Sequence, residues 1–142
     1  MPTIEKYIKR DVIALDASTS CQDAAHLMEA RRIGSVGVRQ GGKLVGIVTE
    51  RDLVYGVMAK GESAKKTIAE VMRTDRPAVA PTTTERDAAH LMQTHQTRHL
   101  LVKKDGEAVG VISMLDVLSL MLEDNRFLIE QLHTYIRGGR GG

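Results

Sequence analysis

Asp23-Ala24-Ala25-His26-Leu27-Met28 is the stretch that decides the fold, because the same six residues return unchanged as Asp87-Ala88-Ala89-His90-Leu91-Met92. When residues 3–54 are aligned with residues 67–118 without a gap, sixteen of the fifty-two positions are identical, well above what ordinary composition gives. A constant internal offset, here 64 residues, is the sign of a duplicated structural unit. The chain therefore consists of two tandem copies of one structural unit.

The residue pattern of each copy predicts the order strand, helix, strand, strand, helix. In the first copy Val12, Ile13 and Leu15 predict a short strand. Ser20 precedes the first helix at capping distance from Asp23, and Thr84 with Asp87 repeats this spacing in the second copy. The pair Gly41-Gly42 favours a hairpin turn, and Asp105-Gly106 the matching turn. A single unit of this size is marginally stable. We therefore expect an α/β (α+β) fold, in which two βαββα repeats pack sheet to sheet about a pseudo-twofold axis.

The offset also predicts the domain organisation. We expect the first repeat over residues 1–60, a linker over 61–66, the second repeat over 67–122, and a C-terminal extension over 123–142. Apolar residues at helical spacing between Leu118 and Ile136 predict an amphipathic helix in this extension. The closing residues 137–142, rich in Gly and Arg, predict a flexible tail.

Composition excludes several classes of protein. The net charge of +2 is too balanced to indicate a nucleic-acid or membrane partner, and the pairs Lys65-Lys66 and Lys103-Lys104 are only weak signals for RNA. There is no Trp and one Phe, so aromatic platforms for single strands are missing. The single Cys21 and the absence of a signal peptide or a long apolar run indicate a cytoplasmic protein.

A second repeated motif ends each copy, as Gly46 to Asp52 and Gly110 to Asp116. Both read Gly, two apolar residues, Thr or Ser, two variable residues, then Asp. This places a hydroxyl and a carboxylate at a helix N-terminus, where the carboxylate could accept both hydrogens of a ribose diol and the hydroxyl could contact phosphate. The same spacing is also that of a plain capping box, so both interpretations stay open.

The tandem unit, the Asp-Ala-Ala-His-Leu-Met helix, the glycine hairpin and the Gly-x-x-Thr/Ser-x-x-Asp ending together resemble a pair of CBS domains, a Bateman module. The resemblance implies two facing sheets with adenosine-containing ligands in the cleft between them. It implies that the motif Asp contacts ribose, while the hydroxyl and the residue before the Asp contact sugar or phosphate. By position these are Thr49, Arg51, Asp52, Ser113 and Asp116.

The resemblance implies further site residues just before the second strand of each copy, and weaker candidates in the loop before the first helix. Arg98 and His99 are the cationic candidates for phosphate, although a solvated Arg and a surface His would fit the pattern equally well. Leu115 stands where Arg51 does, so two unequal sites are expected. The remaining candidates are Ile33, Gly34, Ser35 and Thr97 before the strands, and Thr19, Thr82 and Thr83 in the loops.

No nucleophile stands beside a base and no metal-ligand spacing is present, so we expect neither an enzyme nor a catalytic cofactor or metal. The expected function is a regulatory module that senses AMP, ADP, ATP, NAD or S-adenosylmethionine and modulates a separate effector protein. The resemblance also implies a homodimer, with paired helices and the C-terminal helix at the contact. The alternative is a structural protein-interaction or dimerisation module whose cleft stays empty.

Overall fold

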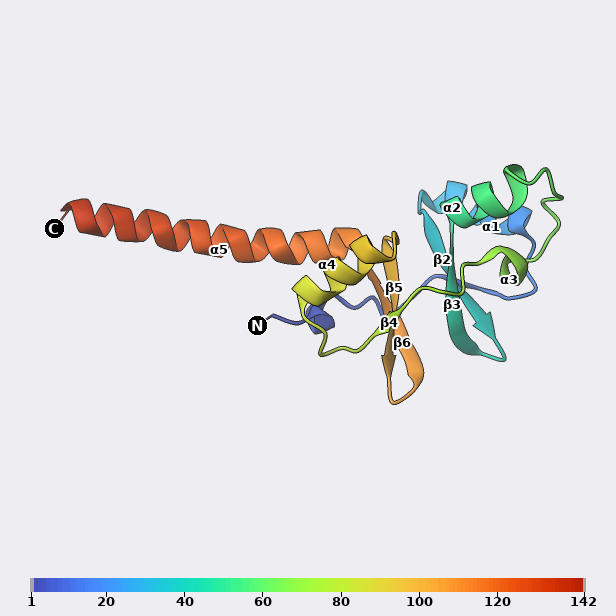
Figure 1. Ribbon diagram of the computed structural model, residues 1–142, viewed down its shortest axis with the longest axis horizontal. Helices are drawn as coiled ribbons and strands as arrows, with labels where there is room; N and C mark the ends of the chain where they lie inside the picture. Colours follow the sequence, from blue (N-terminus) through green and yellow to red (C-terminus); the bar gives the residue numbers. More distant parts are fainter. Residues whose placement is uncertain (1, 142) are drawn as a thin grey trace.

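The chain folds into two lobes, each built on a small three-stranded sheet (Figure 1). The computed structural model describes the backbone of residues 2–141 and the side chains within that range except those of Phe127 and residues 137–141. In each sheet a short first strand pairs in parallel with the second, which pairs in antiparallel fashion with the third. The strands are β1 (Ala14–Asp16), β2 (Ser35–Gln40) and β3 (Lys43–Thr49) in the first lobe, and β4 (Ala78–Val79), β5 (His99–Lys104) and β6 (Glu107–Ser113) in the second.

Helices join and cover these strands where the capping residues predict them. Ser20 and Thr84 each accept a hydrogen bond from the backbone N–H of the Asp three residues on, at 3.1 Å in both lobes, which confirms both predicted caps. The helical segments are η1 (Ile4–Tyr7), α1 (Cys21–Arg31), α2 (Glu50–Leu53), the π-helical η2 (Val54–Met58), α3 (Ile68–Val71), α4 (Glu85–Thr94) and α5 (Met114–Gly141).

The leading segment of each repeat packs into the core of the other repeat. Ile4, in η1, is fully buried among residues of the second lobe such as Met92 and Leu100. Ile68, its equivalent in α3, is fully buried in the first lobe with residues such as Met28. The chain therefore crosses between the lobes twice, once after η1 and once after α3, and neither core is complete without the other repeat.

The leading segments η1 and α3, which are exchanged between the lobes, are held by equivalent backbone hydrogen bonds. The N–H of Ile4 donates to the carbonyl of Thr83 and the N–H of Ile68 donates to the carbonyl of Thr19, each at 2.9 Å. A methyl group on Gly110, in β6, would lie only 2.5 Å from the carbonyl oxygen of Lys9. The motif glycine of the second copy is therefore required by the crossing chain, which passes against the strand.

The two sheets face each other across a small shared core. Ile47 of β3, Leu101 of β5 and Val111 of β6 are buried together there, and they belong to neither of the two larger cores. The facing sheets and the matched contacts of the two repeats confirm the predicted fold class.

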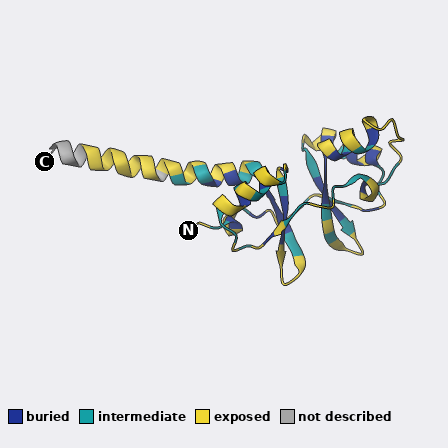
Figure 2. Ribbon diagram, in the orientation of Figure 1, coloured by how far each residue is buried: buried dark blue, intermediate teal, exposed yellow. Residues whose placement is uncertain are grey.

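The last helix, α5, starts at the end of β6 and extends well beyond both lobes (Figure 1). Its first turns bury Val117 and Leu120, whereas residues 128–136, beyond the second lobe, are exposed (Figure 2). The flexible tail over 137–142 stays a prediction: the backbone of 137–141 belongs to α5, and Gly142 lies outside the described residues. Among the described helices, none combines the length and the apolar character that crossing a bilayer requires.

Replacing Ile4 by Ala should lower the free energy of unfolding by about 2–5 kcal/mol, because it removes a fully buried side chain from the second lobe. Denaturant unfolding at equilibrium measures the change. Glu5→Ala, next to it on the exposed side of η1, is the control and should change stability little. Equal effects of the two variants would show that the segment does not contribute to the core.

Candidate functional site

The two repeated motifs place a hydroxyl and a carboxylate at the start of α2 and at the start of α5. In the first lobe the N–H of Thr49 donates to Asp52 at 3.0 Å, and the N–H of Asp52 donates to the Thr49 hydroxyl at 3.2 Å. In the second lobe Ser113 and Asp116 exchange the same bonds, both at 3.1 Å. Both motifs therefore form capping boxes. In each of them the cap uses one carboxylate oxygen of the Asp, and the other oxygen is available to a further partner.

In the first lobe the Asp52 carboxylate is already occupied by a cation from the crossing chain. The guanidinium of Arg76 lies 3.2 and 3.4 Å from the two oxygens of Asp52. The two side chains are only 10% and 9% exposed. A buried pair of this kind is held by charge as well as by hydrogen bonds, and removing one partner leaves the other charge unpaired.

Arg76 also donates hydrogen bonds to four further groups, one of which is the carbonyl of Arg73. Its Nε donates to the hydroxyl of buried Thr97 at 2.9 Å, and one of its terminal nitrogens donates to the carbonyl of Ile47 at 3.2 Å. The second terminal nitrogen also reaches the Thr49 hydroxyl at 3.5 Å. Arg76 thus joins both lobes, because Thr97 belongs to the second and Thr49 to the first.

Sequence reasoning missed Arg76. The signal was present in the alignment of the two copies, since Arg76 stands opposite Val12, so that a cation replaces an apolar residue just before the first strand. The sequence does not show that the chain before the first strand of each repeat crosses from one lobe to the other. Sequence reasoning therefore could not place Arg76 next to Asp52.

The second lobe has no equivalent of this ion pair among its described residues. The position of Arg76 is taken by Val12 and that of Thr97 by Ile33, and neither side chain can donate a hydrogen bond to Asp116. Within the described part of the chain, the hydrogen bonds of the Asp116 carboxylate come from Ser113 alone, whose hydroxyl donates at 2.7 Å. Asp116 is half-buried and retains acceptor capacity for another group.

His99 and Ser35 occupy equivalent positions at the start of β5 and β2, and they meet between the lobes. His99 Nε2 lies 3.1 Å from the Ser35 hydroxyl, while the buried Nδ1 has no partner. Burial lowers the pKa of His99, the positive charge of Arg76 lowers it further, and the charge of Asp116 opposes this. His99 is therefore neutral over most of the physiological pH range and senses charges in both sites.

The other predicted cations lie in different surroundings. Arg98 is exposed, and its carbonyl accepts a hydrogen bond of 2.7 Å from the N–H of Met114, so it lies beside the start of α5. Arg51 is exposed on α2, with its guanidinium 5.9 Å from the centre of the Tyr55 ring. The structure thus brings Arg98 next to the Asp116 motif, whereas Arg51 lies over an aromatic ring of the adjoining η2.

The weaker candidates have structural contacts. Thr19 and Thr83 bind the exchanged segments through their carbonyls, and the Thr83 hydroxyl also accepts from the N–H of Ala80 at 3.1 Å. Thr82 is exposed. The carbonyl of Gly34 accepts from the N–H of Glu50 at 3.0 Å, which mirrors the contact between Arg98 and Met114.

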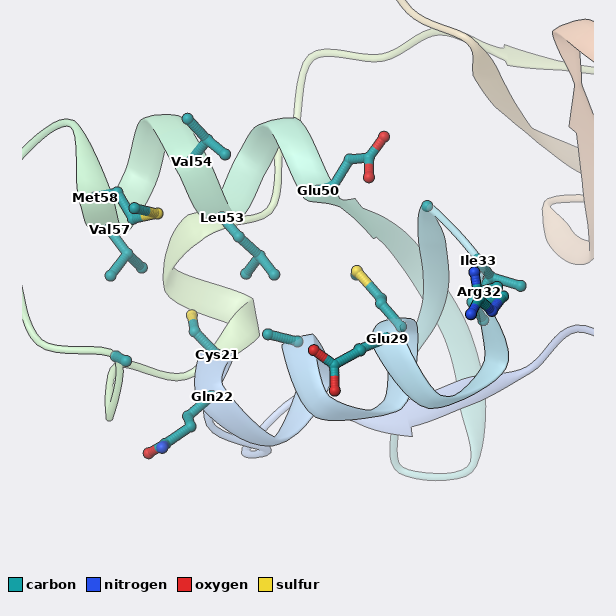
Figure 3. A pocket seen from close by; sticks show the side chains of 14 residues that line it. Cys21, Gln22, Glu29, Arg32, Ile33, Glu50, Leu53, Val54, Val57 and Met58 are labelled. Carbon is teal, nitrogen blue, oxygen red and sulfur yellow. The ribbon is translucent and has the colours of Figure 1, made fainter.

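Two hollows lie near these residues. A small one of about 150 Å³ lies between the sheets beside Arg76, with Ile47 and Leu101 in its walls. A larger one of about 860 Å³ lies in the helical layer of the first lobe, between α1 and the α2–η2 segment (Figure 3). Ile33 and Gly34 line this larger hollow.

Two duplicated lobes, joined by exchanged segments and each carrying a capped carboxylate at the start of a helix, define a tandem-repeat module. The family model of the CBS domain matches residues 4–59 and 68–123. A solved protein with CBS domains from Burkholderia ambifaria is 30% identical and superposes with a TM-score of 0.76, covering 85% of this chain and 92% of the other. The chain belongs to the CBS-domain family and is a CBS-pair regulatory module.

Two further solved structures share the fold and were determined with ligands. The CBS domain pair of protein MJ0100, in complex with 5′-methylthioadenosine and S-adenosyl-L-methionine, is 22% identical, with a TM-score of 0.74 over 87% of this chain and 98% of the other. CBSX2 in complex with AMP is 23% identical, with a TM-score of 0.72 over 88% and 99%. At these identities the likeness concerns the fold.

Replacing Arg76 by Met should lower the free energy of unfolding by about 3 kcal/mol, because it leaves the Asp52 carboxylate buried without its cation. Adding Asp52→Asn to this variant should recover much of the loss. Arg73→Met is the control, since its partner Asp75 is 73% exposed and water can solvate the carboxylate that is left unpaired. A loss for Arg76→Met no larger than that of the control, in denaturant unfolding, would contradict a structural ion pair.

The lowered pKa of His99 predicts a pH dependence of stability. Below about pH 6.5 the unfolded chain protonates this histidine more readily than the folded chain does, so the free energy of unfolding should fall as the pH drops. His99→Gln should make this decline shallower, whereas His26→Gln, on the exposed side of α1, should not. Urea unfolding at about pH 7.5 and about pH 5.5 measures the difference. Parallel declines in all three proteins would refute the assignment.

Proposed function

We propose that this CBS pair is a sensor that binds an adenosine-containing ligand in the cleft between its repeats, with the ribose on Asp116. The observation that carries the proposal is the unequal state of the two motif carboxylates. Asp52 is held by Arg76, whereas, among the residues that the structure describes, the cap residue Ser113 alone bonds to Asp116. The ligands AMP, S-adenosylmethionine and 5′-methylthioadenosine in solved structures of the same fold support the ligand class.

The surroundings of Asp116 fit a nucleoside. A carboxylate accepts both hydrogens of a ribose 2′,3′-diol, and the N-terminus of α5 adds backbone N–H groups and a favourable dipole for an anion. Arg98 lies beside this helix start and supplies a guanidinium for a phosphate chain. Val12 and Ile33, which replace Arg76 and Thr97, offer apolar surface to the base.

The site at Asp52 is proposed to be closed to nucleosides at rest. A ribose diol could bind there only if Arg76 released the carboxylate, and the guanidinium would then lose its contacts to Thr97 and Ile47 as well. Binding at this site would therefore disturb a contact that joins the two lobes. In this proposal the two sites differ in affinity for this reason, in addition to Leu115 standing in place of Arg51.

In this proposal the module regulates a separate effector protein in the cytoplasm and performs no catalysis. Ligand binding would change the relative position of the lobes, and so the affinity for the effector, by a coupling of about 1–3 kcal/mol. The module is proposed to act as a homodimer. The alternative, a structural dimerisation module with an empty cleft, assigns the motif carboxylates to helix capping alone.

Isothermal titration with AMP, ATP, NAD and S-adenosylmethionine tests the sensor. At least one of them should bind, and Asp116→Asn should weaken its binding roughly tenfold or more, since a bidentate contact of a charged acceptor is lost. Asp105→Asn, the same change in the exposed hairpin, is the control and should bind normally. Absence of binding for all four ligands would favour the structural module. Binding with equal affinity in the two variants would overturn the ribose contact of Asp116.

A further inference from the structure

The exposed side of α5 carries a continuous apolar stripe. Its residues are half or more exposed along most of the helix, from 46% at Leu118 to 75% at Leu115 and about 51–53% near the far end. The opposite side of the first turns is already used, because Val117 and Leu120 are buried in the second lobe. The stripe consists of Leu115, Leu118, Leu122, Ile129, Leu132 and Ile136, with Asn125 completing the spacing.

These positions alternate in steps of three and four residues without interruption from Leu115 to Ile136. Such a strict seven-residue repeat differs from the 3.6-residue period of a helix that packs on a globular core, and it imposes a left-handed supercoil. In heptad notation the a positions are Leu115, Leu122, Ile129 and Ile136, and the d positions are Leu118, Asn125 and Leu132.

We propose that α5 forms a parallel, in-register, two-stranded coiled coil with α5 of a second copy of this chain. Ile at position a with Leu at position d favours two parallel strands, and Ile129, Leu132 and Ile136 have this arrangement in the part of the helix that extends beyond the lobes. The paired length from Leu115 to Ile136 is about 30 Å at the helical rise.

The single polar residue of the stripe sets the orientation. In a parallel, in-register pair each residue meets its own copy, so Asn125 faces Asn125 of the second chain and the two amides bond to each other. In an antiparallel pair every d residue faces an a residue. All four a residues are Leu or Ile, so any antiparallel register would bury the Asn125 amide against an apolar side chain.

The residues flanking the seam favour the same orientation. One flank carries Arg126 and His133, and the other carries Leu128 and Tyr135. In a parallel pair unlike flanks meet, so the aliphatic stem of Arg126 and the ring of His133 cover apolar residues of the second helix. In an antiparallel pair like flanks meet, which brings the two copies of Arg126 towards each other when the helices overlap fully.

This inference rests on the proposed homodimer and names the surface that forms it. Two separate measurements distinguish a failure of the coiled coil from a failure of the homodimer. Sedimentation equilibrium of the unmodified chain reports the dimer itself. Cysteine cross-linking without any ligand reports the coiled coil, and the natural Cys21 does not interfere because it is buried. The variants are Asn125→Cys and Leu132→Cys on the seam, and Thr134→Cys on the outer side of α5 as the matched control.

Under mild oxidation both seam variants should form covalent dimers roughly tenfold faster than Thr134→Cys, because only facing d residues approach within disulfide distance. Equal rates at all three positions, or faster reaction of the control, would overturn the coiled coil even if sedimentation shows a dimer. Cross-linking of Asn125→Cys only when it is mixed with Ile129→Cys would show an antiparallel pair and overturn the orientation. A monomer in sedimentation would remove the homodimer as well.

Discussion

The exchange of leading segments between the two lobes is the constraint on which the rest of the molecule depends. Because Ile4 completes one core and Ile68 the other, the chain has to cross the cleft after each segment. These crossings determine what faces the motif carboxylates. One crossing carries Arg76 to Asp52, and the other carries Val12 at the equivalent position. The two sites therefore differ because of the residues on the crossing segments as much as because of the motif residues.

Much of the fold could be predicted from the sequence, because a duplicated sequence imposes a duplicated structure. The caps at Ser20 and Thr84 and the turns at Gly42 and Gly106, where the backbone φ is positive, have local causes and were correctly predicted. The exchange was not predicted, since a buried isoleucine looks the same whichever core it enters. For the same reason the partner of Asp52 was missed, whereas the importance of the carboxylate itself was evident from the repeated motif.

The backbone is close to symmetric while the chemistry of the cleft is not. Ser35 and His99 take equivalent positions and meet between the lobes, yet only one of them responds to pH. Arg76 makes the first site a structural joint, whereas none of the described residues supplies such a cation to Asp116, and the second site is therefore the one proposed to bind a ligand. In a regulatory module this division is useful, because one site can bind while the other transmits the change between the lobes.

The most direct test of this account is a crystal structure of the protein soaked with AMP or S-adenosylmethionine, whichever binds more tightly in solution. The account predicts ribose density within hydrogen-bonding distance of Asp116, with Arg76 still bonded to Asp52. Ribose bound to Asp52 with Arg76 displaced, while the Asp116 site stays empty, would contradict it.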